Sequence, residues 1–263
     1  MTAANKQKIS IVLMVPLLFA TQACTDIFLP GLPTISEEFG ASMQVTNLTI
    51  SIFNISQAIV VLFIGVISDL RGRRATLMTC FALHIVATIW IALCTSRLTM
   101  LVMRVVQATG SAAVYIVLRL VIKDTMDKKA QIHATGLLVM GLVLSPILAP
   151  LLGAWIIQLS SWRNCFWAIA VFEVPLFIWA WIAITETNDK QAAMRASFSV
   201  ANHLANYANV LKDGYFFGMA LIVGSAFAAF YAFISISSYL YINQLGISEA
   251  SYATVFIGDG ATL

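Results

Sequence analysis

The amino-acid sequence predicts an all-α membrane protein, and three observations point to this fold class. Apolar residues make up 60% of the 263-residue chain and charged residues only 10%, whereas about 25% of the residues of a soluble domain are charged. Seven apolar runs each approach or exceed the roughly 20 residues that cross a bilayer. The basic residues collect in alternate connections between these runs, as they do in multi-pass proteins. Together these features exclude a soluble fold.

The seven apolar runs define the predicted membrane-spanning helices. They cover approximately Ile9–Leu29, Val45–Ile67, Ala75–Cys94, Leu98–Ile122, Thr135–Leu159, Cys165–Ile184 and Tyr215–Tyr241. An eighth run starts near Ser248 and reaches Leu263. As a helix it would rise only about 24 Å, so we interpret it as the start of a further span.

The charges in the connections predict the orientation of the chain. One side carries most of the basic residues, namely Lys6, Lys8, Arg71, Arg73, Arg74, Lys123, Lys128, Lys129, Lys190, Arg195 and Lys212. The other side carries Glu37, Glu38, Arg97, Arg163 and Glu249. Because basic loops stay in the cytoplasm, we expect a cytoplasmic N-terminus.

The segment from Glu186 to Gly214 is the longest and most polar connection, and it divides the chain. We predict a six-helix unit over residues 1–186, a cytoplasmic loop over 187–214, and an incomplete second unit over 215–263. Apolar residues recur at helical spacing within the loop, at Phe198, Ala201, Leu204, Ala208 and Leu211. This spacing favours an amphipathic helix on the membrane surface; an irregular linker is the alternative.

Two opposite charges fall inside predicted spans, where an ionisable residue is costly and marks a functional site by default. Asp26 lies about 26 Å along the first span, just before the prolines Pro30 and Pro33. Arg104 lies about 9 Å into the fourth span, which runs in the opposite direction. We therefore expect the two side chains at a similar depth, as a carboxylate that loads and releases a proton beside a cation. A structural ion pair or an interfacial charge is the alternative.

Glu173 is a third intramembrane charge, near the middle of the sixth span. No partner for it is evident in the sequence. Such a carboxyl group is either protonated or faces a wet cavity. A neutral carboxylic acid bonded to a neighbouring helix is the favoured interpretation, and a second proton site is the alternative.

Two glycine-containing patterns predict close backbone packing. The turn at residues 65–74 reads G-x-x-x-D-x-x-G-R-R, in which Gly72 permits a tight reversal and Asp69 can pair across the turn. The fifth span places a small residue at every fourth position, at Gly141, Ser145, Ala149 and Gly153. Such a ridge allows another helix to approach closely, and Pro146 and Pro150 within it free backbone carbonyl groups.

Other functional classes find little support. His84, His133 and His203 lack metal-ligand spacing, no nucleophile–base pair is evident, and the four cysteines are unpaired in pattern. We therefore predict no enzyme, no metal and no cofactor. A retinal protein would need a lysine in its last helix, and 215–241 contains none. The net charge of +3 is too small to indicate nucleic acid as a partner.

The motifs resemble the major facilitator superfamily, specifically drug:proton antiporters of the bicyclomycin-resistance (Bcr/CflA) type. The matching stretches are 26–33 (DIFLPGLP), 65–74 (GVISDLRGRR), 104–110 (RVVQATG) and 145–153 (SPILAPLLG). Phe28, Ala108 and Ser145 replace a tyrosine and two glycines that are usual in the family. Arg119 with Lys123-Asp124, and Ser161-Trp162-Arg163, also fit this branch.

The resemblance implies a fold and roles for individual residues. It implies a major facilitator fold, here an N-terminal six-helix half plus one helix and a stub of the second half. Proton coupling and substrate binding in a central cavity would involve Asp26, Arg104 and Gln107, while Glu173 has no counterpart in the family. A conformational latch would involve Gly65, Asp69, Gly72, Arg73 and Asp124, and the antiporter motif of the fifth span comprises Gly141, Ser145, Pro146, Pro150 and Gly153.

The resemblance also implies a departure, because family members have twelve spans in two halves that rock against each other. The helices expected to face the fifth-span ridge, and to complete the latch, are absent. We interpret the chain as a fragment or as the product of a truncated gene, in which case it would be inactive.

The expected function is proton-coupled export of small, amphipathic drugs across the bacterial inner membrane. Export of a defined metabolite, such as an amino acid or a siderophore, is the alternative. The expected partners are a small-molecule substrate, protons and the lipid bilayer.

Overall fold

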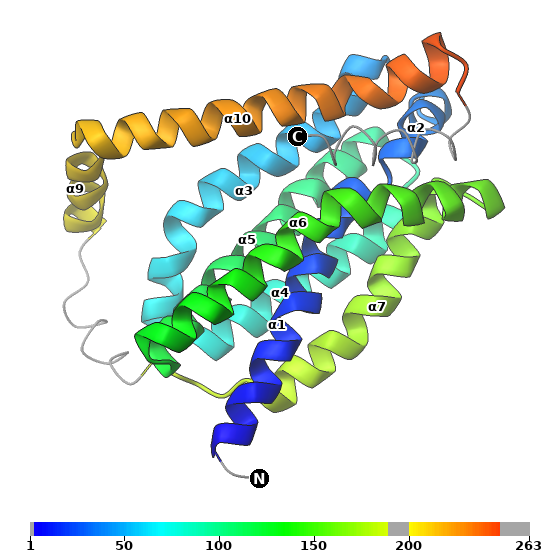
Figure 1. Cartoon of the computed structure of the whole chain (residues 1–263). Coiled ribbons are helices and arrows are strands. Elements are labelled where there is room, and N and C mark those ends of the chain that lie inside the picture. Colours follow the sequence, from blue (N-terminus) through cyan, green and yellow to red (C-terminus); the bar gives the residue numbers. More distant parts are fainter. Residues whose placement is uncertain (1–2, 189–199, 248–263) are drawn as a thin grey trace.

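The computed structural model describes residues 3–188 and 200–247 and contains only helices within those ranges (Figure 1). The helices are α1 (Ala3–Asp26), α2 (Leu32–Glu38), α3 (Met43–Arg71), α4 (Arg73–Leu93), α5 (Arg97–Thr125), α6 (Lys128–Leu159), α7 (Trp162–Ala183), α9 (Val200–Leu211) and α10 (Gly214–Ser238). Two short helical segments, a 3-10 turn at Leu29–Gly31 and a π-helix at Tyr239–Gln244, complete the described chain.

Seven helices in the described ranges are long and apolar enough to cross a membrane, which confirms the predicted count. The structural helices extend the predicted spans at their polar ends, since Lys128–Leu159 includes a basic first turn that the hydropathy boundary at Thr135 left out. The eighth run, from near Ser248, lies outside the described residues. The predicted division into units at 186/187 and 214/215 stays a prediction.

The prolines after Asp26 interrupt the first span as expected. Helix α1 ends at Asp26, Pro30 lies in the 3-10 turn, and α2 begins at Leu32 with Pro33 in its first turn. Proline lacks a backbone N–H and has a fixed φ, so it suits the first turn of a helix, and Pro30 and Pro33 lie in the first turns of the two short helices that follow α1. The break leaves Asp26 at a helix end inside the bundle.

Helix α1 lies at the centre of a six-helix bundle and packs against α5, α6 and α7 (Figure 1). It is the most buried of the spans: 78% of its apolar window lies inside the protein. Helix α4 packs on α5 and α7, and α3 packs on α5. Two buried apolar clusters fill the bundle, one around Phe28, Phe53 and Phe166 and the other around Leu77 and Phe81.

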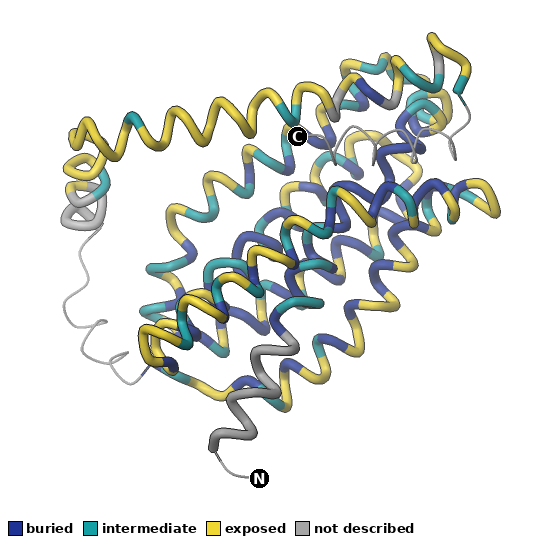
Figure 2. The backbone as a smooth tube through the Cα atoms, viewed as in Figure 1, coloured by how far each residue is buried: buried dark blue, intermediate teal, exposed yellow. Residues whose placement is uncertain are grey.

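Helix α10 is the least buried span. None of its apolar window is buried, and Figure 2 shows it exposed along most of its length, crossing the bundle beside α3. The helix predicted between residues 198 and 211 is confirmed from Val200 onward as α9, and Tyr207 Oη donates to the carbonyl of Leu62 on α3 at 2.6 Å. Whether α9 lies on a membrane surface stays a prediction.

Candidate transport site

Asp26 is buried and receives a hydrogen bond from a neighbouring helix. The residue is 5% exposed, and Ser145 Oγ of α6 donates to its Oδ2 at 2.6 Å. Ser145 stands where the family pattern has glycine, so this contact belongs to the side chain that departs from the pattern. A hydrogen bond, in addition to packing, therefore holds Asp26 against α6.

Arg104 is completely buried and lies among aromatic rings. Its guanidinium carbon is 4.1 Å from the ring centre of Phe28, 5.1 Å from that of Phe166 and 5.8 Å from that of Phe53. A cation over a ring face is attracted by about 2 kcal/mol or more when water is excluded. Nη1 donates to the carbonyl of Cys24, on α1, and to Oε1 of Gln107. Nε and Nη2 have no hydrogen-bond partner among the described residues.

Asp26 and Arg104 do not form the expected close pair. They interact electrostatically, yet within the described ranges no ion pair joins them. The reason is local: the guanidinium turns toward the Cys24 carbonyl and the Phe28 ring, while the carboxylate bonds Ser145. The prediction of similar depth holds in part, because Arg104 contacts the α1 backbone two residues before Asp26.

Glu173 has a partner that the sequence did not reveal. Its Oε1 lies 2.9 Å from Nε2 of His84, on α4, and both side chains are 0% exposed. His84 Nδ1 lies 2.8 Å from the carbonyl oxygen of Gln107. The two groups are close, but His84 Nε2 and both carboxyl oxygens of Glu173 make no well-directed hydrogen bond among the described residues, so the favoured interpretation of a carboxyl group bonded to a neighbouring helix stays a prediction. The available signal was a histidine in the middle of an apolar span.

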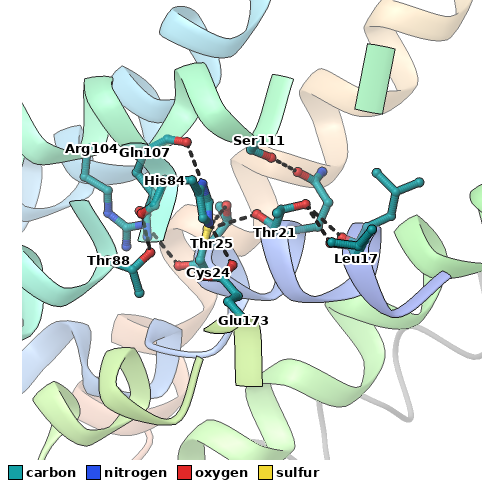
Figure 3. A network of polar contacts seen from close by, with 12 residues as sticks. Leu17, Thr21, Cys24, Thr25, His84, Thr88, Arg104, Gln107, Ser111 and Glu173 are labelled. Atoms are coloured by element: carbon teal, nitrogen blue, oxygen red, sulfur yellow. Dashed lines mark hydrogen bonds and ion pairs between the residues drawn. The ribbon is translucent and has the colours of Figure 1, made fainter. Parts of the chain in front are cut away.

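These side chains form one buried polar cluster, which we define as His84, Thr88, Arg104, Gln107 and Glu173 (Figure 3). Gln107 lies at its centre: its Nε2 donates to Thr88 Oγ1 at 2.8 Å, and its Oε1 accepts from Arg104 at 2.9 Å. Thr88 in turn donates to the carbonyl of His84. The cluster thus connects α4, α5 and α7.

A second polar group joins α1, α3 and α5 nearer the middle of α1. Ser111 Oγ donates to Gln22 Oε1 at 2.7 Å, and Gln57 Nε2 donates to both of these side chains at 3.1 Å. Sequence reasoning missed this triad because its members are uncharged and far apart in the chain. Neutral amides and hydroxyls are weaker signals in an apolar span than charges are.

The small-residue ridge of α6 already has its partner within the described bundle. A Cβ atom at Gly153 would collide with the carbonyl oxygen of Ile27, and one at Gly141 would lie 2.8 Å from that of Val15. The expectation that the ridge faces helices absent from the chain was therefore wrong, because α1 occupies it. Pro146 and Pro150 lie inside a continuous α6, on the stretch that faces this contact.

The arginine-rich turn, residues Arg71 to Arg74, brings predicted latch residues together. Arg73 pairs with Asp69, and its Nε lies 3.0 Å from Oδ2 of Asp124. Gly72 has φ +100°, a conformation that only glycine adopts without strain. Gly65 is not part of this contact: a Cβ there would meet nothing within 4 Å.

Glu186 is a further member of this turn that the sequence did not assign. Its two carboxylate oxygens accept the backbone N–H groups of Arg73 and Arg74, at 2.9 and 3.2 Å, so it caps α4 from the end of α7. Burial acts to raise the pKa of Glu186, but hydrogen bonds from the backbone N–H groups of Asn188, Arg73, Thr187 and Arg74 outweigh it and hold the pKa below its usual range. The sequence feature that could have pointed to Glu186 is its position as a carboxylate directly after an apolar span.

A second clamp holds the opposite end of the bundle. Glu38, at the end of α2, accepts from Trp162 Nε1 at 2.8 Å and from Arg163 Nη1 at 2.7 Å. Arg163 also donates to the carbonyl of Cys94 at 2.9 Å and lies over the Trp162 ring. The Ser161-Trp162-Arg163 motif therefore ties α7 to α2 and α4.

The buried polar side chains of the bundle interior include several ionisable groups. No group of three or more His, Cys, Asp or Glu side chains within the described ranges could hold a metal ion. What the bundle interior offers is a buried carboxylate, a buried guanidinium in an aromatic surround, and a buried imidazole–carboxyl pair. This combination, in a bundle of membrane-spanning helices, defines the class of multi-pass transport proteins.

The chain belongs to the Major Facilitator Superfamily, whose sequence model matches residues 14–263. The curated relatives include the multidrug resistance protein MdtL of Escherichia coli O9:H4 (strain HS), 25% identical over 230 residues, and that of strain K12 / DH10B, 26% identical over 230 residues. Each alignment covers 88% of this chain and 57% of the relative. The chain thus spans little more than half the length of these proteins.

Solved structures share the fold. A bacterial homologue of the human lysosomal transporter Spinster, in an inward-facing and unoccupied conformation, superposes with a TM-score of 0.73 at 19% identity, over 96% of this chain and 59% of that one. The human organic anion transporter MFSD10 (TETRAN) superposes with a TM-score of 0.72 at 18% identity, over 100% of this chain and 71% of that one. These likenesses show the major facilitator fold of an N-terminal half.

Proposed function

We propose that this chain supplies the N-terminal half of a proton-coupled antiporter of the drug-exporting branch of the superfamily, in the inner membrane of a bacterium. The observation that carries the proposal is the state of Arg104: a fully buried cation with two nitrogens that have no partner among the described residues. A buried charge without full compensation is strongly unfavourable. It persists where an acceptor group of a ligand completes the site during function.

Asp26 is the proposed proton carrier. Its carboxylate is buried, has one hydrogen bond from Ser145, and lies within electrostatic reach of Arg104. Protonation would neutralise it, and deprotonation would leave an anion that favours a nearby cation. A substrate cation and a proton can therefore compete for the same carboxylate, which is the basis of antiport.

Small amphipathic drugs are the proposed substrates. The side chains around Arg104 are aromatic and apolar, with few polar groups, as in pockets that accept varied apolar ligands. The relatives named multidrug resistance proteins support the same substrate class. Export would run outward from a cytoplasmic side that carries the arginine-rich turn and the N-terminus.

The arginine-rich turn is the proposed latch of one conformation. Asp69, Arg73 and Asp124 join α3, α4 and α5 through charges that are still 30% and 24% exposed at the two aspartates. Partly solvated ion pairs are cheap to break and remake. Gly72 allows the reversal, and the open face at Gly65 leaves room for a helix from elsewhere.

Ethidium uptake into inside-out vesicles, in which export from the cytoplasmic face fills the lumen, tests the proposal with the product of the complete reading frame. We expect uptake into the vesicles to require an acidic interior, and Asp26→Asn to abolish it. Asp127→Asn is the matched control, because Asp127 is exposed and caps α6, a position that asparagine also suits. Unchanged, proton-dependent uptake in Asp26→Asn would remove Asp26 from the mechanism.

A further inference from the structure

A fully buried imidazole–carboxyl pair lies apart from Asp26, between α4 and α7. His84 Nε2 and Glu173 Oε1 are 2.9 Å apart, and neither side chain has any exposed surface. His84 Nε2 and both carboxyl oxygens of Glu173 make no well-directed hydrogen bond among the described residues, so the contact of the pair is one of proximity. Figure 3 shows both side chains beside Cys24 of α1, together with the other members of the buried polar cluster.

The hydrogen bonding of His84 fixes where its first proton sits. Nδ1 lies 2.8 Å from the carbonyl oxygen of Gln107, and a carbonyl oxygen can only accept. Nδ1 therefore carries a hydrogen, and Nε2 is the nitrogen that faces Glu173. This leaves Nε2 free to hold a second proton or to accept one from the carboxyl group.

The pair holds one proton between its two facing atoms. With that proton, His84 and Glu173 are either imidazolium and carboxylate or imidazole and carboxylic acid, and both forms have zero net charge. Without it, a carboxylate oxygen would face the lone pair of Nε2 at 2.9 Å. The charge left behind would lie in an interior that disfavours it. One extra proton thus binds to a basic pair of charge −1.

Neighbouring helices hold the pair in place and connect it to Arg104. Gly110 of α5 lies so close that a Cβ atom there would be 2.3 Å from the Cβ of His84. Cys24 is the ionisable group that contacts His84 from α1. From α5, Arg104 shares Gln107 with the pair: the carbonyl of Gln107 contacts His84, and its side chain binds Arg104.

We propose that His84 and Glu173 form a second proton-binding site, and that its occupancy is felt at Arg104 through Gln107. The site rests on the proposed antiport function and extends it from one exchanged proton to two. The step is simple binding, in which one proton joins the imidazole–carboxylate pair and later leaves it. No other reactant is consumed.

The number of exchanged protons can be measured in proteoliposomes that contain the product of the complete reading frame, with the membrane potential clamped to zero. At steady state, the logarithm of the ethidium concentration ratio rises linearly with the imposed pH difference, and the slope is the number of protons exchanged per ethidium. We expect Glu173→Gln to lower the slope by one, which is about tenfold in the ethidium ratio per pH unit. A merely structural pair would change the rate or the amount of active protein and leave the slope as it was.

The double variant His84→Gln/Glu173→Gln separates proton binding from packing. It replaces the pair with two neutral amides of similar size. Because the single proton belongs to the pair, the double variant should lose the same one proton as Glu173→Gln, with better yield of folded protein. A slope that stays at the wild-type value in both variants overturns the proposal.

An infrared pH titration of the purified protein in liposomes tests whether the His84–Glu173 pair binds a proton, independently of transport. The carboxyl and imidazole bands that differ between wild type and the double variant should titrate in a single step. If wild type builds no proton-driven ethidium gradient, the proposed antiport fails, and the titration still tests the site. Bands that stay constant across about pH 5–9, the range around the usual pKa of histidine, overturn it.

Discussion

The arginine-rich turn and the buried polar cluster both gather charged side chains, yet they treat them in opposite ways. In the turn, Arg73 meets Asp69 and Asp124, and the two carboxylates remain partly exposed. In the cluster, Arg104 is fully buried, meets aromatic rings and carbonyl groups, and keeps two nitrogens without a partner among the described residues. A nearby anion, Asp26, bonds to a serine instead.

The difference shows that access to water sets the free-energy cost of leaving a charged side chain unpaired. Where water reaches, ion pairs are cheap to form and to break, so they suit a contact that opens and closes. Where water is excluded, an incompletely paired charge is costly unless something else completes it. The ion pairs of the turn therefore suit a contact that opens and closes, and the incompletely paired charge of the cluster suits the binding of a ligand.

The packing that separates the cluster from water gives the largest expected effect. Gly153→Ala places a methyl group against the backbone of Ile27, the residue directly after α1, so we expect loss of most folded protein. Gly136→Ala on the same helix is the control, because a Cβ there meets nothing within 4 Å. Fluorescence-detected size exclusion of the two variants measures the difference. Equal, wild-type-like profiles would show that α1 does not sit on the ridge.

Breaking the turn should cost less. Arg73→Ala leaves Asp69 and Asp124 without their shared cation, and we expect a loss of about 2 kcal/mol in unfolding free energy, roughly 1 kcal/mol for each partly exposed ion pair. Arg71→Ala, in the same turn and exposed, should stay within about 0.5 kcal/mol. Chemical denaturation in detergent micelles compares them. A similar loss in both would mean that net charge, and not the pairing, matters.

The aromatic surround of Arg104 predicts a functional loss without a loss of charge. Arg104→Lys keeps the cation but removes the planar group over Phe28 and Phe166. We expect ethidium efflux to fall about 30-fold, equivalent to about 2 kcal/mol. Arg119→Lys, exposed on the same helix, should transport normally. Full activity in Arg104→Lys would show that charge alone is sufficient there.

The Glu186 cap should give the smallest effect, and one that depends on pH. Its pKa is lowered in the folded protein, so its stabilising contribution is fully present above the ordinary value of 4.5 and is lost as pH falls through the folded pKa. Glu186→Gln retains an accepting oxygen but removes the charge at the α4 N-terminus, a change of about 0.5 kcal/mol. Melting temperatures of the two proteins should differ near neutral pH and converge in acid. A constant offset across this range would contradict the cap.

The amino-acid sequence is enough to predict the fold class and the seven spans, and it points to candidate residues inside them. Hydropathy is a property of contiguous segments, and the cost of a charge inside a span depends on residue type. Asp26, Arg104 and Glu173 therefore stand out from their place in the sequence alone. Proline by itself does not decide where a span breaks, because α1 ends before Pro30 and Pro33 while α6 continues through Pro146 and Pro150.

Which groups meet depends on the tertiary structure. The packing of the bundle places α1 on the α6 ridge, turns Arg104 toward Phe28 instead of Asp26, joins Glu173 to His84, and brings Glu186 to the start of α4. Each contact joins residues far apart in the chain. Helical spacing tells which face a side chain occupies but not which helix lies against that face, and that choice depends on how all the helices pack together.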